Sequence, residues 1–255
     1  MPDSSEAFSY ADLADLALAA PIAAHVRVDR ARALAARDAP NVPSGYRRFL
    51  IEGRVAALIR GPAELAQQVR FLADLPDQNG RAARIRRNTE YLLLAAPVSG
   101  RPGELRLIAP DSLIAFDPAA AARLRAILRE SLAPDAPPRI TGIGRAFNVP
   151  GSLPGESETQ IFLQTGDGRP ISLSVLRRPG ERPHWSVALS EIVDEAAAPP
   201  EPDTLLWYRL ACTLPAQLPA QSLQEANDPE RRAIGADYRL VKERLGPCVR
   251  NRRPR

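Results

Sequence analysis

Glu158, Ser174, His184 and Ser186 are the residues whose types and spacing could carry out catalysis. They fall within residues 156–194, where apolar residues alternate with short polar ones between turns rich in glycine and proline. This pattern is typical of half-buried antiparallel strands joined by hairpins. A serine, a histidine and a carboxylate on one sheet face would suit a hydrolase. His184 would act as the base, Glu158 would orient it, and Ser174 or Ser186 would be the nucleophile.

Turn residues set the register of these strands. A loop at 166–168 pairs Ile161 with Leu173, and a loop around 179–180 pairs Leu173 with Val187. Both pairings place the same apolar set inward, and a slip of one residue would turn every side chain over. The predicted inner face comprises Thr159, Ile161, Leu163, Ile171, Leu173, Val175, Trp185, Val187 and Leu189. On the predicted outer face, one row holds Gln160, Ser174 and Ser186, and the next holds Glu158, Leu176 and His184.

Serines in the middle of a strand are poorly presented as nucleophiles, and the sequence supplies no evident oxyanion hole. Short polar residues are also what the solvated face of an antiparallel sheet ordinarily carries. We therefore favour a non-enzymatic binding or protein-interaction module, whose partner would be a protein or a small ligand. A hydrolase that uses the four residues above is the alternative.

Several standard sites are missing from the sequence. Lys242 is the only lysine and lies in no glycine-rich loop, which excludes a Walker A phosphate loop. Gly142 and Gly144 have no third glycine at the dinucleotide-binding spacing. There is no GxSxG or HExxH motif, and the two histidines and two cysteines are widely separated. We therefore expect no cofactor and no metal site.

The chain carries 34 basic and 30 acidic residues, a net charge of +4, and its arginine-rich composition indicates a GC-rich bacterial gene. Arginines cluster at 81–87 and 177–182, which favours single-stranded nucleic-acid binding through an N-terminal barrel as a third alternative. Aromatic residues are only 5%, which weakens that alternative because bases stack on aromatic side chains. The basic tail at 249–255 could instead pair with the acidic N-terminal segment.

The order of elements predicts an α+β fold that is mainly antiparallel. A helix at 10–20 and five or six strands between residues 22 and 116 indicate a small β-barrel, OB-like or SH3-like, in residues 1–117. Asn79-Gly80 is the strongest hairpin signal within it. A connecting helix follows at 118–134, and residues 138–255 form a second antiparallel β-meander closed by two C-terminal helices.

Two features bear on the compartment. No stretch approaches the roughly 18–20 apolar residues needed to cross a membrane, and the acidic N-terminus lacks the basic region of a signal peptide. These features predict a soluble, cytoplasmic protein with no membrane partner. Cys212 and Cys248 are expected to be reduced thiols, and a single bridge between them is the alternative. The oligomeric state is left open.

Overall fold

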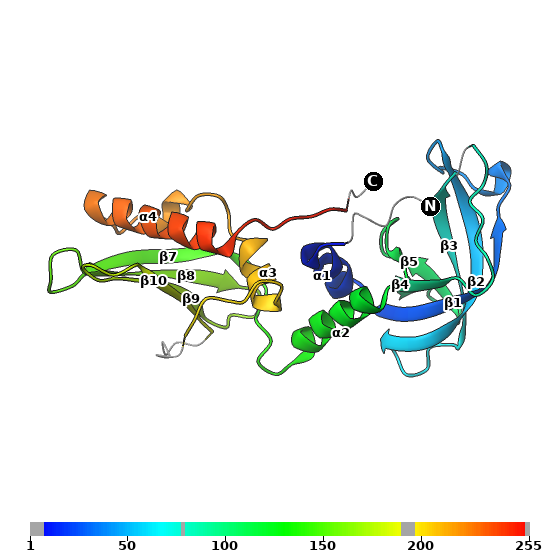
Figure 1. Ribbon diagram of the computed structural model, residues 1–255, viewed down its shortest axis with the longest axis horizontal. Helices are drawn as coiled ribbons and strands as arrows, with labels where there is room; N and C mark the ends of the chain where they lie inside the picture. The colour runs from blue at the N-terminus through cyan, green and yellow to red at the C-terminus, as the bar shows by residue number, and fades with distance from the viewer. Residues whose placement is uncertain (1–7, 78–79, 190–196, 253–255) are drawn as a thin grey trace. The chain divides into compact units, whose positions relative to one another are not determined.

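The computed structural model describes residues 8–77, 80–189 and 197–252. The chain forms two compact units, Met1–Arg129 with Arg250–Arg255, and Glu130–Val249 (Figure 1). Each unit contains a β-sheet and helices, so the α+β class and its largely antiparallel pairing are confirmed. Among the described residues, no helix is both long enough and apolar enough to cross a membrane.

The first unit is a closed β-barrel with a helix at each end of its sequence. Its elements are α1 (Tyr10–Ala19), β1 (Ile22–Ala33), the short 3-10 helix η1 (Ala36–Asp38), β2 (Tyr46–Arg60), β3 (Gln68–Pro76), β4 (Glu90–Pro97), β5 (Glu104–Leu107), β6 (Leu113–Ala115) and α2 (Pro118–Leu132). The strand order is β1-β2-β3-β5-β4-β6, and β4 also pairs with β1, which closes the barrel. All of these pairs are antiparallel except β3 with β5. A small N-terminal barrel is thus confirmed.

Alternating residues of the barrel strands fill its interior. Val26, Val28, Phe49, Ile51, Val69 and Phe71 are all buried, and they alternate with polar neighbours such as Arg27, Arg48 and Arg70. The period of two that a strand imposes therefore sorts the sequence into an apolar lining and an outer surface. β2 passes close to β1 at Gly53, where an added Cβ would lie 2.7 Å from the carbonyl oxygen of Arg27.

The turn of the predicted Asn79-Gly80 hairpin falls partly outside the described residues, so this hairpin stays a prediction. Residues 78–79 lie outside the described residues, but the strands on either side of them are described. β3 pairs with β2 and β5, whereas β4 pairs with β1, β5 and β6. β4 closes the barrel against β1 along six residue pairs, and apolar side chains of both strands are buried there.

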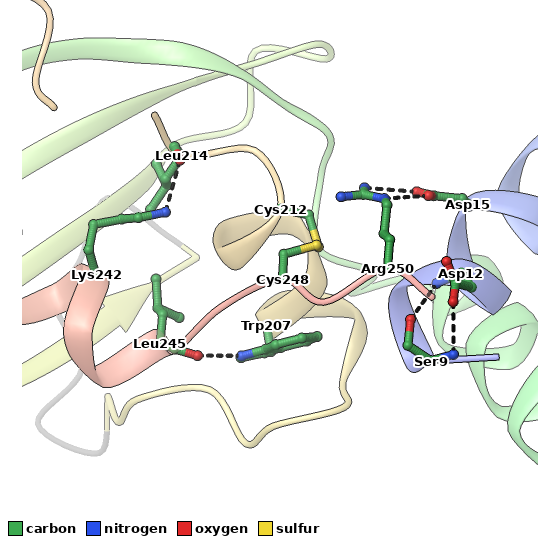
Figure 2. The surroundings of a disulfide bond; sticks show 10 residues. All are labelled: Ser9, Asp12, Asp15, Trp207, Cys212, Leu214, Lys242, Leu245, Cys248 and Arg250. Carbon is green, nitrogen blue, oxygen red and sulfur yellow. Dashed lines mark hydrogen bonds and ion pairs between the residues drawn. A yellow bond between two sulfur atoms is a disulfide. The ribbon is translucent and has the colours of Figure 1, made fainter. Parts of the chain in front are cut away.

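The C-terminal tail belongs to the first unit through contacts with α1 (Figure 2). Ser9 and Asp12 form a capping box at the start of the helix, and the Asp12 side chain is fully buried. One oxygen of that carboxylate also accepts hydrogen bonds from the backbone N–H groups of Asn251 (2.9 Å) and Arg252 (3.3 Å). Arg250 makes a two-bond ion pair with Asp15. The expected pairing of the basic tail with the acidic N-terminal segment is therefore confirmed.

A second ion pair holds the tail against the barrel. The Arg252 guanidinium donates two hydrogen bonds, of 2.8 and 3.0 Å, to the carboxylate of Asp111. The Arg252 side chain is only 12% exposed, so this pair is better shielded from water than a surface salt bridge. Hydrogen bonding to Asp111 raises the pKa of Arg252 and outweighs the opposite effect of burial.

The second unit is a four-stranded antiparallel sheet with two α-helices. Its elements are β7 (Ile140–Pro150), β8 (Ser157–Thr165), β9 (Ile171–Arg177), β10 (His184–Ala188), α3 (Leu205–Ala211), the 3-10 helix η2 (Ala220–Leu223) and α4 (Asp228–Leu245), and the strand order is β10-β9-β8-β7. The predicted register is correct, since Ile161 lies opposite Leu173 and Leu173 opposite Val187. Of the predicted inner face only Leu189 is wrong, because it follows the end of β10 and is 41% exposed.

Helix α4 covers the inner face of this sheet. Its buried side chains are Ile234, Asp237, Tyr238, Val241 and Leu245. Asp237 accepts hydrogen bonds from the Thr159 hydroxyl and from Arg177 Nε (2.6 Å), so the one buried charge of the helix is paired. Burial raises the pKa of Tyr238 to about 12, and its hydroxyl donates to the Pro215 carbonyl oxygen.

Cys212 and Cys248 form a disulfide that joins the end of α3 to the segment after α4 (Figure 2). The expectation of reduced thiols is therefore wrong, and the bridged alternative is correct. The two cysteines are brought together because α3 packs beside the end of α4, where Trp207 Nε1 donates a 2.8 Å hydrogen bond to the Leu245 carbonyl oxygen. Sequence spacing alone did not reveal this packing.

We predict that deletion of residues 250–255 lowers the melting temperature of the first unit by about 5 °C at low salt, and by less at high salt. The deletion removes two ion pairs and leaves the buried Asp12 carboxylate with fewer donors. Arg125→Ala on the exposed face of α2 is the matched control and should change little. A salt-independent change measured by calorimetry would contradict this assignment.

We also predict that reduction of the disulfide destabilises the second unit by about 4 kcal/mol, because the bridge closes a loop of 36 residues. Denaturant unfolding with and without dithiothreitol measures the effect. The double variant Cys212→Ser, Cys248→Ser should match the reduced protein and no longer respond to dithiothreitol. Equal stability of the oxidised and reduced proteins would show that the bridge does not stabilise the fold.

Candidate functional site

The outer face of the 157–188 sheet carries the residues predicted as catalytic, in the predicted rows. Ser174 lies directly opposite Ser186, and Leu176 lies opposite both Glu158 and His184. Glu158 and His184 are therefore two strand spacings apart, about 10 Å, with Leu176 between them. Leu176 therefore separates the carboxylate from the histidine that it would have to orient.

The local environment of these residues also differs from that of an open active site. Ser174 and Ser186 are only 8% and 7% exposed, whereas His184 is exposed. The Ser174 hydroxyl has no hydrogen-bond partner among the described residues, and the Glu158 carboxylate accepts a 2.9 Å hydrogen bond from Gln160 Nε2. The hydrolase assignment stays a prediction, and Ser174 and Ser186 are both largely shielded from solvent.

A larger site lies on the barrel, in a groove of about 830 Å³ between β2 and β3 on one side and β5 with its flanking loops on the other. Most of its lining is apolar. The lining residues are Arg48, Leu50, Arg70, Phe71, Leu72, Asp74, Val98, Arg101, Glu104, Leu105, Arg106, Leu107, Ile108, Ala109 and Pro110. We call it the barrel groove.

Leu50 and Leu72 form the apolar floor of the barrel groove. They are a cross-strand pair of β2 and β3, and Leu72 is 46% exposed. Each is flanked along its strand by buried residues, Phe49 and Ile51 beside Leu50, and Phe71 and Ala73 beside Leu72. Because side chains alternate along a strand, the leucines must point away from the barrel core. An exposed leucine over an apolar cavity is a typical feature of a binding site.

Ion pairs form the rim of the barrel groove. Arg48 makes two hydrogen bonds, of 2.7 and 2.8 Å, to the Asp74 carboxylate opposite it. At the other end, Glu104 pairs with both Arg70 and Arg101. These contacts fix the arginines beside the apolar floor and neutralise part of their charge.

The rim contacts shift the pKa values of their members. Partial desolvation raises the pKa of Glu104, but hydrogen bonds from Arg101 and Arg70 outweigh it, so the net pKa lies below the ordinary value of 4.5. The hydrogen bond to Asp74 raises the pKa of Arg48. Arg48 and Glu104 therefore stay ionised at neutral pH.

Sequence reasoning missed the barrel groove, although a signal for it was present. Phe49-Leu50-Ile51 and Phe71-Leu72 are consecutive apolar residues within strands whose opposite face is otherwise polar. In a strand with one buried face, such a run necessarily places one apolar side chain outside. The position of β5 and its loops beside those leucines could not be read from the sequence.

No group of histidine, cysteine, aspartate or glutamate side chains in the described part of the chain is arranged to hold a metal ion. The sequence matches no protein-family model and no curated protein. Any functional proposal for this protein therefore rests on the geometry and charge of its sites.

We predict that the Glu104 carboxyl titrates below pH 4.5 and that replacing its arginine partners raises this midpoint. Since the folded-state pKa is lowered, the stabilisation from Glu104 is present above the unfolded pKa and is lost as the pH falls through the folded pKa. NMR titration of the Glu104 side chain in the wild type and in Arg70→Ala, Arg101→Ala measures the shift. Identical midpoints would show that these ion pairs do not form in solution.

Proposed function

We propose that this protein is a non-enzymatic binding module whose barrel groove holds an apolar segment of a partner protein. The observation that carries the proposal is the half-exposed Leu72, which lies with Leu50 on the floor of an 830 Å³ apolar groove with charged ends. Covering such a surface removes apolar area from water at about 25 cal/mol per Å². The fixed ion pairs at both ends would restrict which segments fit.

The composition of the groove favours a protein segment over a nucleic acid. Three of its four arginines, Arg48, Arg70 and Arg101, are already paired with carboxylates that would also repel phosphates. Its one aromatic residue is Phe71, which is buried in the barrel and offers no face for base stacking.

Single-stranded nucleic-acid binding remains the second candidate because of the barrel itself. We infer an OB-like rather than an SH3-like barrel, since a parallel β3–β5 pair and closure of β1 on β4 suit a five-stranded Greek-key barrel. Arg30, Arg32 and Arg106 have no ion-pair partner among the described residues and would be the phosphate contacts.

The hydrolase alternative is less well supported, because its serines are buried and Leu176 lies between Glu158 and His184. If the outer face of this sheet is catalytic, His184→Ala should abolish turnover of an ester, peptide or phosphate substrate found by screening. We expect no turnover of these substrates that depends on His184. Activity lost in this variant, with the fold intact by circular dichroism, would support the hydrolase instead.

For the compartment, the disulfide favours an oxidising environment over the cytoplasm expected from the sequence. We infer that the working protein is the bridged form. Alkylation of free thiols in producing cells before lysis, followed by mass spectrometry, tests this. Full alkylation of Cys212 and Cys248 would show that both thiols are reduced in the cell, and it would favour a reducing compartment.

We predict that Leu72→Arg abolishes binding of peptides selected from a displayed random library on the intact, oxidised protein. The arginine side chain would lie at the groove floor, where it replaces the apolar contact that Leu72 makes with a ligand by a charged group. Leu58→Arg is the matched control, because Leu58 is similarly exposed, at 40%, but does not line the groove. Binding is measured by calorimetry or fluorescence anisotropy.

Three outcomes discriminate the candidates. Peptides that bind the wild type and Leu58→Arg but not Leu72→Arg support the proposal. Peptides that bind all three proteins equally would place the site elsewhere. Salt-dependent binding of single-stranded oligothymidine, reduced by Arg30→Ala with Arg32→Ala and unaffected by Leu72→Arg, would favour the nucleic-acid candidate.

A further inference from the structure

The edge of β3 changes partner within the barrel groove. β3 pairs with β2 along its whole length, Gln68–Pro76, but its parallel ladder with β5 comprises only Arg70 and Phe71. Beyond Phe71, β5 follows β4 instead: Leu107 pairs with Ala95, and the N–H of the next residue donates to the Leu94 carbonyl oxygen. The segment of β3 after Phe71 therefore faces the groove.

Backbone groups of β3 point into this opening. The Arg70 N–H donates to the Gly103 carbonyl oxygen across the β3–β5 seam, at 2.8 Å. Because the backbone direction repeats every two residues in a strand, the N–H and C=O of Asp74 point to the same edge. Leu72 and Asp74 both line the groove. The groove thus combines an apolar floor with a short segment of strand edge.

The charge of the groove lining limits which segments can bind there. Four arginines and two carboxylates line the barrel groove, which leaves two surplus positive charges beside the apolar floor. Arg106 contributes directly to this surplus, since it has no ion-pair partner among the described residues. A complementary segment would carry acidic residues next to its apolar ones.

We propose that the occupant of the barrel groove is an extended, acidic and apolar segment of a partner protein, which adds as a strand to the edge of β3 at Leu72–Asp74. This inference rests on the proposed function and specifies the form of the ligand. Backbone hydrogen bonds to β3 would supply affinity, and alternate side chains would meet the Leu50–Leu72 floor. The acidic residues would lie near Arg106.

The experiment uses a peptide selected from the displayed library for binding that requires Leu72 and tolerates Leu58→Arg. Single amides of this peptide are replaced by esters, each of which removes one N–H donor and keeps the side chains. We expect affinity to fall about tenfold at alternate positions and to change little at the positions between them. Backbone hydrogen exchange at Asp74 should slow in the complex.

Each result has a defined meaning. A Leu72-dependent peptide that tolerates an ester at every position, or that leaves Asp74 exchange unchanged, would overturn strand addition and leave the proposed function standing. If no Leu72-dependent peptide can be selected, both the proposed function and this inference fail. Replacement of the peptide's acidic residues by their amides tests the charge component, and unchanged affinity would contradict it.

Discussion

The barrel of the first unit depends on β1 pairing with β2 along one edge and with β4 along the other. The close approach of Gly53 to the Arg27 carbonyl oxygen permits the first of these ladders to stay tight, since any side chain there would clash. β5 pairs with β4 through three residue pairs, and it shares only two residue pairs with β3. The barrel groove is a direct consequence of this competition for β5.

The two units use charged residues differently. In the second unit, the charge of Asp237 is buried against the sheet and fully paired, which fixes α4 over the inner face. In the first, the Arg48–Asp74 and Arg70–Glu104 pairs lie at the ends of an apolar surface that a partner could cover. Charges that are already paired add little non-specific attraction for polyanions, whereas an apolar floor between them selects by shape.

Local patterns in the sequence predicted the structure where contacts are local. The hairpins around residues 166–168 and 179–180 gave the correct register, because alternation and turn chemistry agree over short separations. The β3–β5 pair and the Cys212–Cys248 bridge join residues separated by whole elements, and no local pattern encodes them. For the same reason, the row of Ser174 and Ser186 was predicted correctly, but its burial and the barrel groove were not.

Binding of the partner in the barrel groove is open to a direct test. NMR chemical-shift mapping on isotope-labelled, oxidised protein tests it most directly, with a library-selected peptide as the ligand. We expect the largest shifts at Leu50, Leu72 and Leu107, which line the groove. Shifts centred on Ser174 and His184 instead, with the barrel unperturbed, would show that the partner does not bind the barrel groove.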